Sequence, residues 1–82
     1  MQTIIVEVDI PSTGDSFDFR LPSTGRIGDI AREMVRILEN TGNNLLFDEN
    51  SMLCDRERGI ILNKNDTVAQ ACLSDGARLM LL

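Results

Sequence analysis

The chain has 82 residues, of which 43% are hydrophobic and 26% are charged, and this is the composition of an ordinary small globular protein. A chain of this length supports one hydrophobic core, so we expect residues 1–82 to form a single domain. The 8 Lys and Arg residues against 13 Asp and Glu residues give a net charge of −5. Such a charge disfavours binding to nucleic-acid phosphates and to anionic membrane surfaces.

Few side chains in the sequence suit catalysis or metal binding. Histidine, the commonest general base and metal ligand, is absent, and so are Trp and Tyr. Cys54 and Cys72 form no C-x-x-C pair and are too few for an iron–sulfur cluster or a standard zinc site. We therefore expect no enzyme activity, no cofactor and no metal. The two cysteines are expected to be buried or half-buried free thiols, with a disulfide or a redox role as the alternatives.

The sequence also lacks a recognisable targeting segment. The first cation is Arg20, and Glu7 and Asp9 interrupt the only apolar stretch before it, which is unlike the basic start and apolar centre of a signal peptide. Apolar runs such as residues 79–82 are too short to span a bilayer. We therefore expect a cytoplasmic protein that does not insert into a membrane.

Residues 3–9 and 16–21 both alternate apolar with polar side chains, which is the period of a half-buried strand. Pro11 and Gly14, between the two runs, are typical turn residues. The N-terminal part is therefore predicted to be a β-hairpin. The side chains expected to point inward are Ile4, Val6, Val8, Phe17, Phe19 and Leu21.

Residues 26–40 change to the helical period. Their apolar side chains fall within one arc of roughly 160°, which predicts a helix with one buried and one solvated side. The apolar set is Ile27, Ile30, Ala31, Met34, Val35, Ile37 and Leu38. Ser23 or Thr24 is expected to cap the start of the helix, and Gly42 to end it.

The second half of the sequence is predicted to form short elements joined by turns. Strands are expected at 51–55, 60–62 and 77–82, with a charged turn at 56–59 and a loop at 63–66. Residues 45–47 are apolar and are expected to fold back onto the core. Residues 67–71 suit a single helical turn capped by Asp66 or Thr67, and residues 74–76 suit a tight turn.

This order of elements predicts a two-layer α+β domain of the β-grasp type, in which a mixed sheet of about four to five strands packs on one helix. The last strand is apolar at nearly every position, so it is expected in the centre of the sheet. It would lie parallel to the first strand, because the helix and third strand provide the long crossover that parallel pairing needs.

The hairpin, the helix and the closing segment resemble the ubiquitin-like family. In that family a capped turn, a buried aliphatic residue and an Asp-Gly turn precede the last strand, and here these are Thr67, Leu73 and Asp75-Gly76. Within the family, the chain most resembles the YukD/EsaB-type proteins of bacterial type VII secretion systems. The shared features are Phe17-Asp18-Phe19-Arg20-Leu21, Asp29-Ile30-Ala31 and an end at the last strand.

This resemblance implies a non-conjugating accessory or adaptor protein of a type VII (ESX-type) secretion system, which acts by protein–protein interaction. The implied partners are cytosolic domains of the secretion machine, and a homodimer is also open. Ubiquitin-like modifiers and sulfur carriers end in Gly-Gly, whereas this sequence ends at Leu79-Met80-Leu81-Leu82 and has Lys64 as its one lysine. A modifier or sulfur carrier is the alternative, which the missing Gly-Gly disfavours. A nucleic-acid module is a third possibility, which the net charge disfavours.

The sheet face opposite the helix is the first candidate interaction surface. Alternation places Ile5, Met52 and Met80 on that face, and the alternative is that they are scattered singly or covered. The neighbours expected to point inward are Ile4, Val6, Val8, Leu53, Leu79 and Leu81.

A second candidate is the acidic side of the predicted helix, with Asp29, Glu33 and Glu39, where Arg32 and Arg36 favour an ordinary solvated face. The other carboxylates are expected in turns or in solvent. These are Asp9, Asp15, Asp18, Asp48, Glu49, Asp55, Glu57, Asp66 and Asp75.

Overall fold

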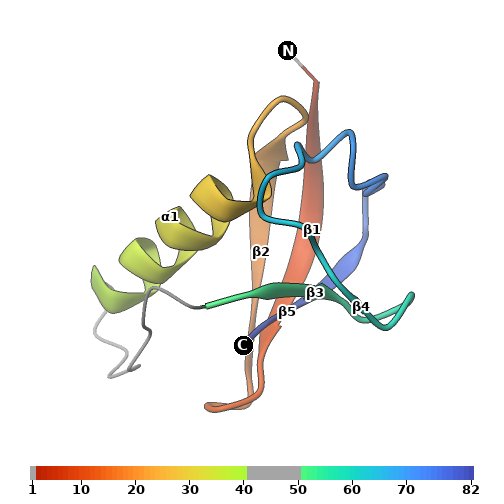
Figure 1. Ribbon diagram of the computed structural model, residues 1–82. Helices are drawn as coiled ribbons and strands as arrows, with labels where there is room; N and C mark the ends of the chain where they lie inside the picture. Colours follow the sequence, from red (N-terminus) through yellow and green to blue (C-terminus); the bar gives the residue numbers. More distant parts are fainter. Residues whose placement is uncertain (1, 41–50) are drawn as a thin grey trace.

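The computed structural model describes residues 2–40 and 51–82. In chain order the elements are β1 (Thr3–Ile10), β2 (Asp15–Pro22), α1 (Ile27–Asn40), β3 (Leu53–Asp55), β4 (Ile60–Ile61) and β5 (Arg78–Leu81). The strands form one five-stranded sheet in the order β2-β1-β5-β3-β4, and α1 lies across one face of it (Figure 1). This arrangement confirms the predicted α+β β-grasp architecture.

The last strand lies in the centre of the sheet, as predicted. β5 pairs parallel with β1 and antiparallel with β3. Its inward side chains, Leu79 and Leu81, are fully buried because neighbouring strands flank them and the core covers them. The outward side chains of β5 are therefore the ones that face away from α1.

The N-terminal hairpin packs its predicted inner face on the core. β1 and β2 are antiparallel, and Val6 lies opposite Phe19 while Val8 lies opposite Phe17. Val6, Val8 and Leu21 are buried, and the two phenylalanines are half-buried against the core. β1 runs one residue further than predicted and so adds Ile10 to the buried set.

Helix α1 buries most, but not all, of its predicted apolar arc. Ile27, Ile30, Ala31, Met34 and Leu38 are buried and Val35 is half-buried. The prediction for Ile37 was wrong, because 43% of this residue is exposed. Ile37 lies at the margin of the arc, where α1 overhangs the sheet edge formed by β2.

The start of α1 is held by backbone from a distant loop and not by a capping side chain. The Ile27 N–H donates to the Asp66 carbonyl at 2.8 Å, and the Gly28 N–H donates to the Lys64 carbonyl at 3.0 Å. The prediction that Ser23 or Thr24 caps the helix was therefore wrong. The loop lies so close to the first turn of α1 that a Cβ on Gly28 would lie 3.1 Å from the Lys64 carbonyl oxygen.

The short elements of the second half agree with the predicted order but are shorter. β3 has three residues and β4 has two. Thr67 caps the turn at 67–71, since its Oγ1 accepts from the Gln70 N–H at 3.1 Å while Gln70 Oε1 accepts from the Thr67 N–H at 2.9 Å. Predictions for Gly42, residues 45–47, Asp48 and Glu49 lie outside the described residues.

Among residues 2–40 and 51–82, no helix combines the length and the apolar composition needed to cross a membrane.

Candidate interaction surfaces

The sheet face away from α1 carries a contiguous group of apolar side chains. Cys54 lies opposite both Met80 on β5 and Ile61 on β4, and residues directly opposite one another point to the same face. Met52 and Leu82 extend the group, because each donates its N–H to the carbonyl of the other, at 3.0 and 2.9 Å. We call these five residues the outer-face cluster: Met52, Cys54, Ile61, Met80 and Leu82.

The outer-face cluster is substantially open to solvent. Ile61 is 60% exposed, Leu82 51% and Met52 44%, while Cys54 and Met80 are half-buried beneath them. Two of the predicted surface residues, Met52 and Met80, thus lie in one group. Cys54, Ile61 and Leu82 were missed, although the alternation of β3 and β5 could have placed Cys54 and Leu82 on this face.

The third predicted residue, Ile5, is 45% exposed but does not belong to the cluster. On β1 it lies four positions before Asp9, the residue opposite Met80, and this is roughly 13 Å along the strand. A charged band separates the two sites. In it Arg78 pairs with Glu7 at 3.5 Å, and Arg56 pairs with Asp9.

Asp9 is the best-connected carboxylate of this band. The Ser16 hydroxyl donates to its Oδ1 at 2.6 Å, and Arg56 donates to its Oδ2. The hydrogen bond from Ser16, together with the positive charge and hydrogen bond of Arg56, holds the pKa of Asp9 below its ordinary value. Asp9 is therefore ionised at neutral pH, and the ion pairs of the band give the outer-face cluster a polar border.

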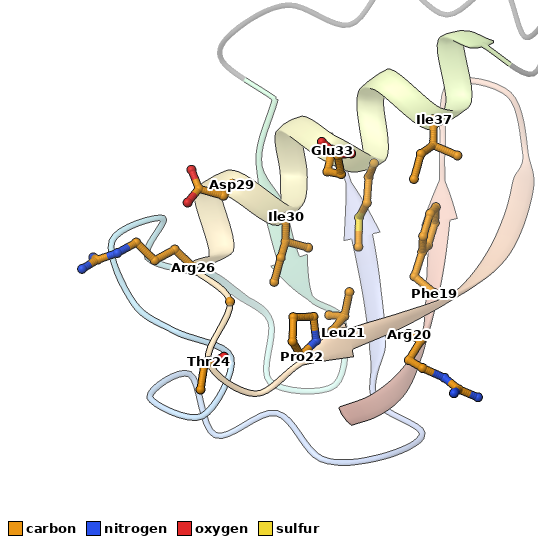
Figure 2. A pocket seen from close by; sticks show the side chains of 12 residues that line it. Phe19, Arg20, Leu21, Pro22, Thr24, Arg26, Asp29, Ile30, Glu33 and Ile37 are labelled. Carbon is orange, nitrogen blue, oxygen red and sulfur yellow. The ribbon is translucent and has the colours of Figure 1, made fainter. Parts of the chain in front are cut away.

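A groove lies on the other side of the molecule, between β2 and α1, with a volume of about 560 Å³ (Figure 2). Phe19, Leu21 and Pro22 line it from β2, and Ile30, Met34 and Ile37 line it from α1. Asp29 and Glu33 form its helical lip. The groove was not predicted, because it exists only where α1 passes over the edge of the sheet.

The acidic side of α1 is solvated, with paired charges. Asp29 lies 3.7 Å from Arg32, and Glu33 pairs with Arg36. Exposed pairs of this kind contribute little to stability. Only Asp29 and Glu33 border the groove, whereas Glu39 does not line it.

Comparison with protein-family models and with curated proteins finds no match. Solved structures, in contrast, match over nearly the whole chain. The EccD5 ubiquitin-like domain from Mycobacterium xenopi is 20% identical with a TM-score of 0.81, and the match covers 100% of this chain and 94% of that one. A ubiquitin from Caldiarchaeum subterraneum is 12% identical with a TM-score of 0.77, covering 98% and 91%. The ubiquitin-like domain of Plasmodium falciparum Dsk2 is 14% identical with a TM-score of 0.75, covering 98% and 96%.

The chain has the ubiquitin-like β-grasp fold. At these identities the similarity establishes the fold alone, and the predicted ubiquitin-like resemblance is confirmed at that level. The YukD/EsaB-type assignment within this fold remains a prediction.

The two cysteines are free thiols in different surroundings. Cys54 is half-buried in the outer-face cluster, as expected of a small apolar side chain. The expectation for Cys72 was wrong, because this residue is exposed. Cys72 directly follows the turn at 67–71. Its positive φ of 58° places it in the left-handed region, where the chain changes direction after the turn.

Asp55 is the one buried charged residue among the described residues, with 5% exposure. It accepts from the Glu57 and Arg58 N–H groups at 3.0 and 3.2 Å and from Arg58 Nε at 2.6 Å. Arg58 also donates to the Ala71 carbonyl at 2.7 Å. Asp55 therefore caps the β3–β4 turn, as expected of a turn carboxylate, and ties it through Arg58 to the turn at 67–71.

Proposed function

We propose that this ubiquitin-like protein is a non-enzymatic accessory protein of a bacterial type VII secretion system. It would act in the cytoplasm by binding cytosolic domains of the secretion machine. The sequence resemblance to YukD/EsaB-type proteins supports this role. The fold shared with the EccD5 ubiquitin-like domain is compatible with it.

The main structural support for this proposal is the exposure of the outer-face cluster. Contiguous apolar side chains that remain exposed on a small monomer are typical of a surface that a partner covers. The charged band of Glu7, Asp9, Arg56 and Arg78 borders the cluster, which gives the apolar centre and polar rim of a protein interface. Ile61, the most exposed member, offers the largest apolar area to a partner.

Replacing Ile61 by aspartate should strongly weaken partner binding, because the carboxylate would be buried unpaired at the interface. The tagged protein would be purified from the native cell, and the co-purifying secretion proteins would be quantified by mass spectrometry. We expect their yield to fall about tenfold or more with Ile61→Asp. Circular dichroism would check that the variant is folded.

Adjacent Ile60 provides a matched control. It is 46% exposed on the same short strand, but it lies opposite Asp55 and points to the other face of the sheet. Ile5→Asp and Ile60→Ser should therefore retain the partners, and serine at position 60 avoids a second carboxylate opposite Asp55. Equal yields from Ile61→Asp and wild type would refute docking through the outer-face cluster.

The intact mass of the same purified protein tests the alternative role as a modifier or sulfur carrier. An adaptor should have the mass of the unmodified chain. An adenylate, thiocarboxylate or isopeptide adduct at the C-terminus would replace the adaptor proposal with carrier chemistry.

A further inference from the structure

Three sulfur-containing side chains lie together in the outer-face cluster. Cys54 on β3 lies directly opposite Met80 on β5, and Met52 precedes Cys54 by two positions, so all three point to the same face of the sheet. Cys54 is a free thiol. Cys54 and Met80 are half-buried and Met52 is exposed, so the three side chains are accessible from the solvent side of the sheet.

The spacing of these residues allows their sulfur atoms to meet at one point. Residues directly opposite one another, such as Cys54 and Met80, have Cβ atoms about 5 Å apart. Met52 lies roughly 7 Å from Cys54 along β3 and roughly 7–8 Å from Met80 across the diagonal. The centre of this triangle is about 4 Å from each Cβ. A methionine side chain is unbranched with three rotatable bonds, so its sulfur can turn towards an ion at that centre.

The ligands in this group are soft. A cysteine thiolate with methionine thioethers suits Cu(I), whereas zinc binds thiolate, imidazole and carboxylate ligands. Among the described residues, no group of three or more Cys, Asp and Glu side chains could hold a metal ion. Asp9 lies beside Met80 on β1. Its carboxylate already accepts from Ser16 and Arg56, so the residues around the sulfur atoms favour a soft ion over a hard one.

The apolar neighbours of the three sulfur atoms suit a neutral complex. Ile61 lies opposite Cys54 on β4, and Leu82 lies opposite Met52. When Cu(I) binds, the Cys54 thiol gives its proton to the solvent, and the charge of the thiolate cancels that of the ion. The two thioethers add no charge. Isoleucine and leucine can therefore surround the complex without the desolvation cost of an unpaired charge.

We propose that Met52, Cys54 and Met80 form a binding site for one Cu(I) ion. Three sulfur atoms from two neighbouring strands hold the ion. This goes beyond the proposed function, because it assigns a metal to residues that the proposed function uses only as apolar surface. It also departs from the expectation of no metal, which rested on histidine and cysteine ligands and left methionine aside.

Titration of the purified full chain with Cu(I) tests the proposal. The metal would be added in the absence of oxygen and in competition with ferrozine, whose absorbance reports how much Cu(I) the protein takes up. We expect one Cu(I) per chain, and X-ray absorption should show only sulfur atoms around the metal. Ag(I), a soft ion that is not oxidised in air, should shift the NMR methyl signals of Met52 and Met80. It should leave the signal of Met34 unchanged, because Met34 is buried in the core.

Single substitutions test each ligand. Met52→Leu and Met80→Leu should each weaken Cu(I) binding by about tenfold or more, since even the outer partners of metal ligands contribute that much. Cys54→Ser should weaken it further, because the thiolate is the charged ligand. Cys72→Ser is the matched control, as it removes the exposed thiol outside the cluster and should leave the affinity unchanged. Circular dichroism would check that each variant is folded.

The double substitution Met52→Leu with Met80→Leu separates this proposal from the proposed function. It removes both thioethers but keeps side chains of similar volume and apolarity on the outer face. The affinity for Cu(I) should fall, while the yield of co-purifying secretion proteins should stay at the wild-type level. The metal site and the docking surface can therefore fail independently.

Three outcomes would overturn the Cu(I) site. The first is that wild type takes up no more Cu(I) than Cys54→Ser, and the second is that the double methionine variant binds as tightly as wild type. The third is one Cu(I) shared by two chains, which would mean that thiolates of two copies bridge the ion without the methionines.

Discussion

Replacing Leu79 by alanine should lower the free energy of unfolding by about 3 kcal/mol, as is usual when a buried leucine leaves a cavity. Leu79 is 0% exposed at the centre of the sheet, with Val8 opposite it on β1 and Asp55 opposite it on β3. Because strands flank it on both sides and the core packs above it, the surroundings cannot collapse easily into the space. The expected loss is a large part of the roughly 5–10 kcal/mol that a small domain has in total.

Leu82→Ala is the matched control for this experiment, since it removes the same atoms from a leucine that is 51% exposed on the other face. Its cost should stay within about 0.5 kcal/mol. Urea unfolding followed by circular dichroism would measure both variants. Similar losses for the two variants would contradict the burial described for β5.

Replacing Asp55 by alanine should lower the free energy of unfolding by about 2 kcal/mol, because several donors lose their acceptor at once. The Glu57 and Arg58 N–H groups and the Arg58 guanidinium all donate to Asp55. Without its carboxylate partner, Arg58 would also hold the Ala71 carbonyl less firmly. Asp18→Ala, at an exposed position on β2, should cost within about 0.5 kcal/mol in the same urea assay.

The contribution of Asp55 should depend on pH in a defined direction. Burial raises the pKa of its carboxyl, but the hydrogen bonds from the Arg58 side chain and from the Arg58 and Glu57 N–H groups outweigh burial. The pKa is consequently held below the ordinary 3.8. Since the folded state then has the lower pKa, the stabilisation is complete well above pH 4 and is lost as the pH falls through the folded pKa.

Urea unfolding of wild type and Asp55→Ala between neutral pH and about pH 2 would test this dependence. The difference between the two proteins should be constant at neutral pH and shrink in acid. A difference that grew as the pH fell would show that the carboxyl is held in its neutral form in the folded state.

The hairpin and the central strand were predictable because their signals are local. Alternation in residues 3–9 and 16–21 fixes which side chains face inward, and the nearly unbroken apolar run at the end of the sequence fits only a position covered on several sides. Periodicity also identified α1, but it could not tell Ile37 from its buried neighbours. How many apolar side chains of α1 the sheet covers depends on where the helix crosses the sheet.

The candidate surfaces were predictable only in part. Alternation correctly placed Ile5, Met52 and Met80 at positions on the outer face, yet it could not show that a charged band separates Ile5 from the other two. That separation follows from the register between β1 and β5, which brings Asp9, and not Ile5, beside Met80. Ile61 was missed for the same reason, since only its pairing with Cys54 adds it to the cluster.

The kinds of elements, their order and the α+β architecture follow from the hydrophobic period and the turn chemistry of each segment, so they could be predicted from the residues alone. Which residues from separate segments share a surface depends on how the segments pack together. The cap of α1 by the Asp66 and Lys64 carbonyls, the outer-face cluster and the groove beside β2 all join residues distant in the chain. Strand register and helix crossing create these contacts, and neither is set by the residues of any one segment.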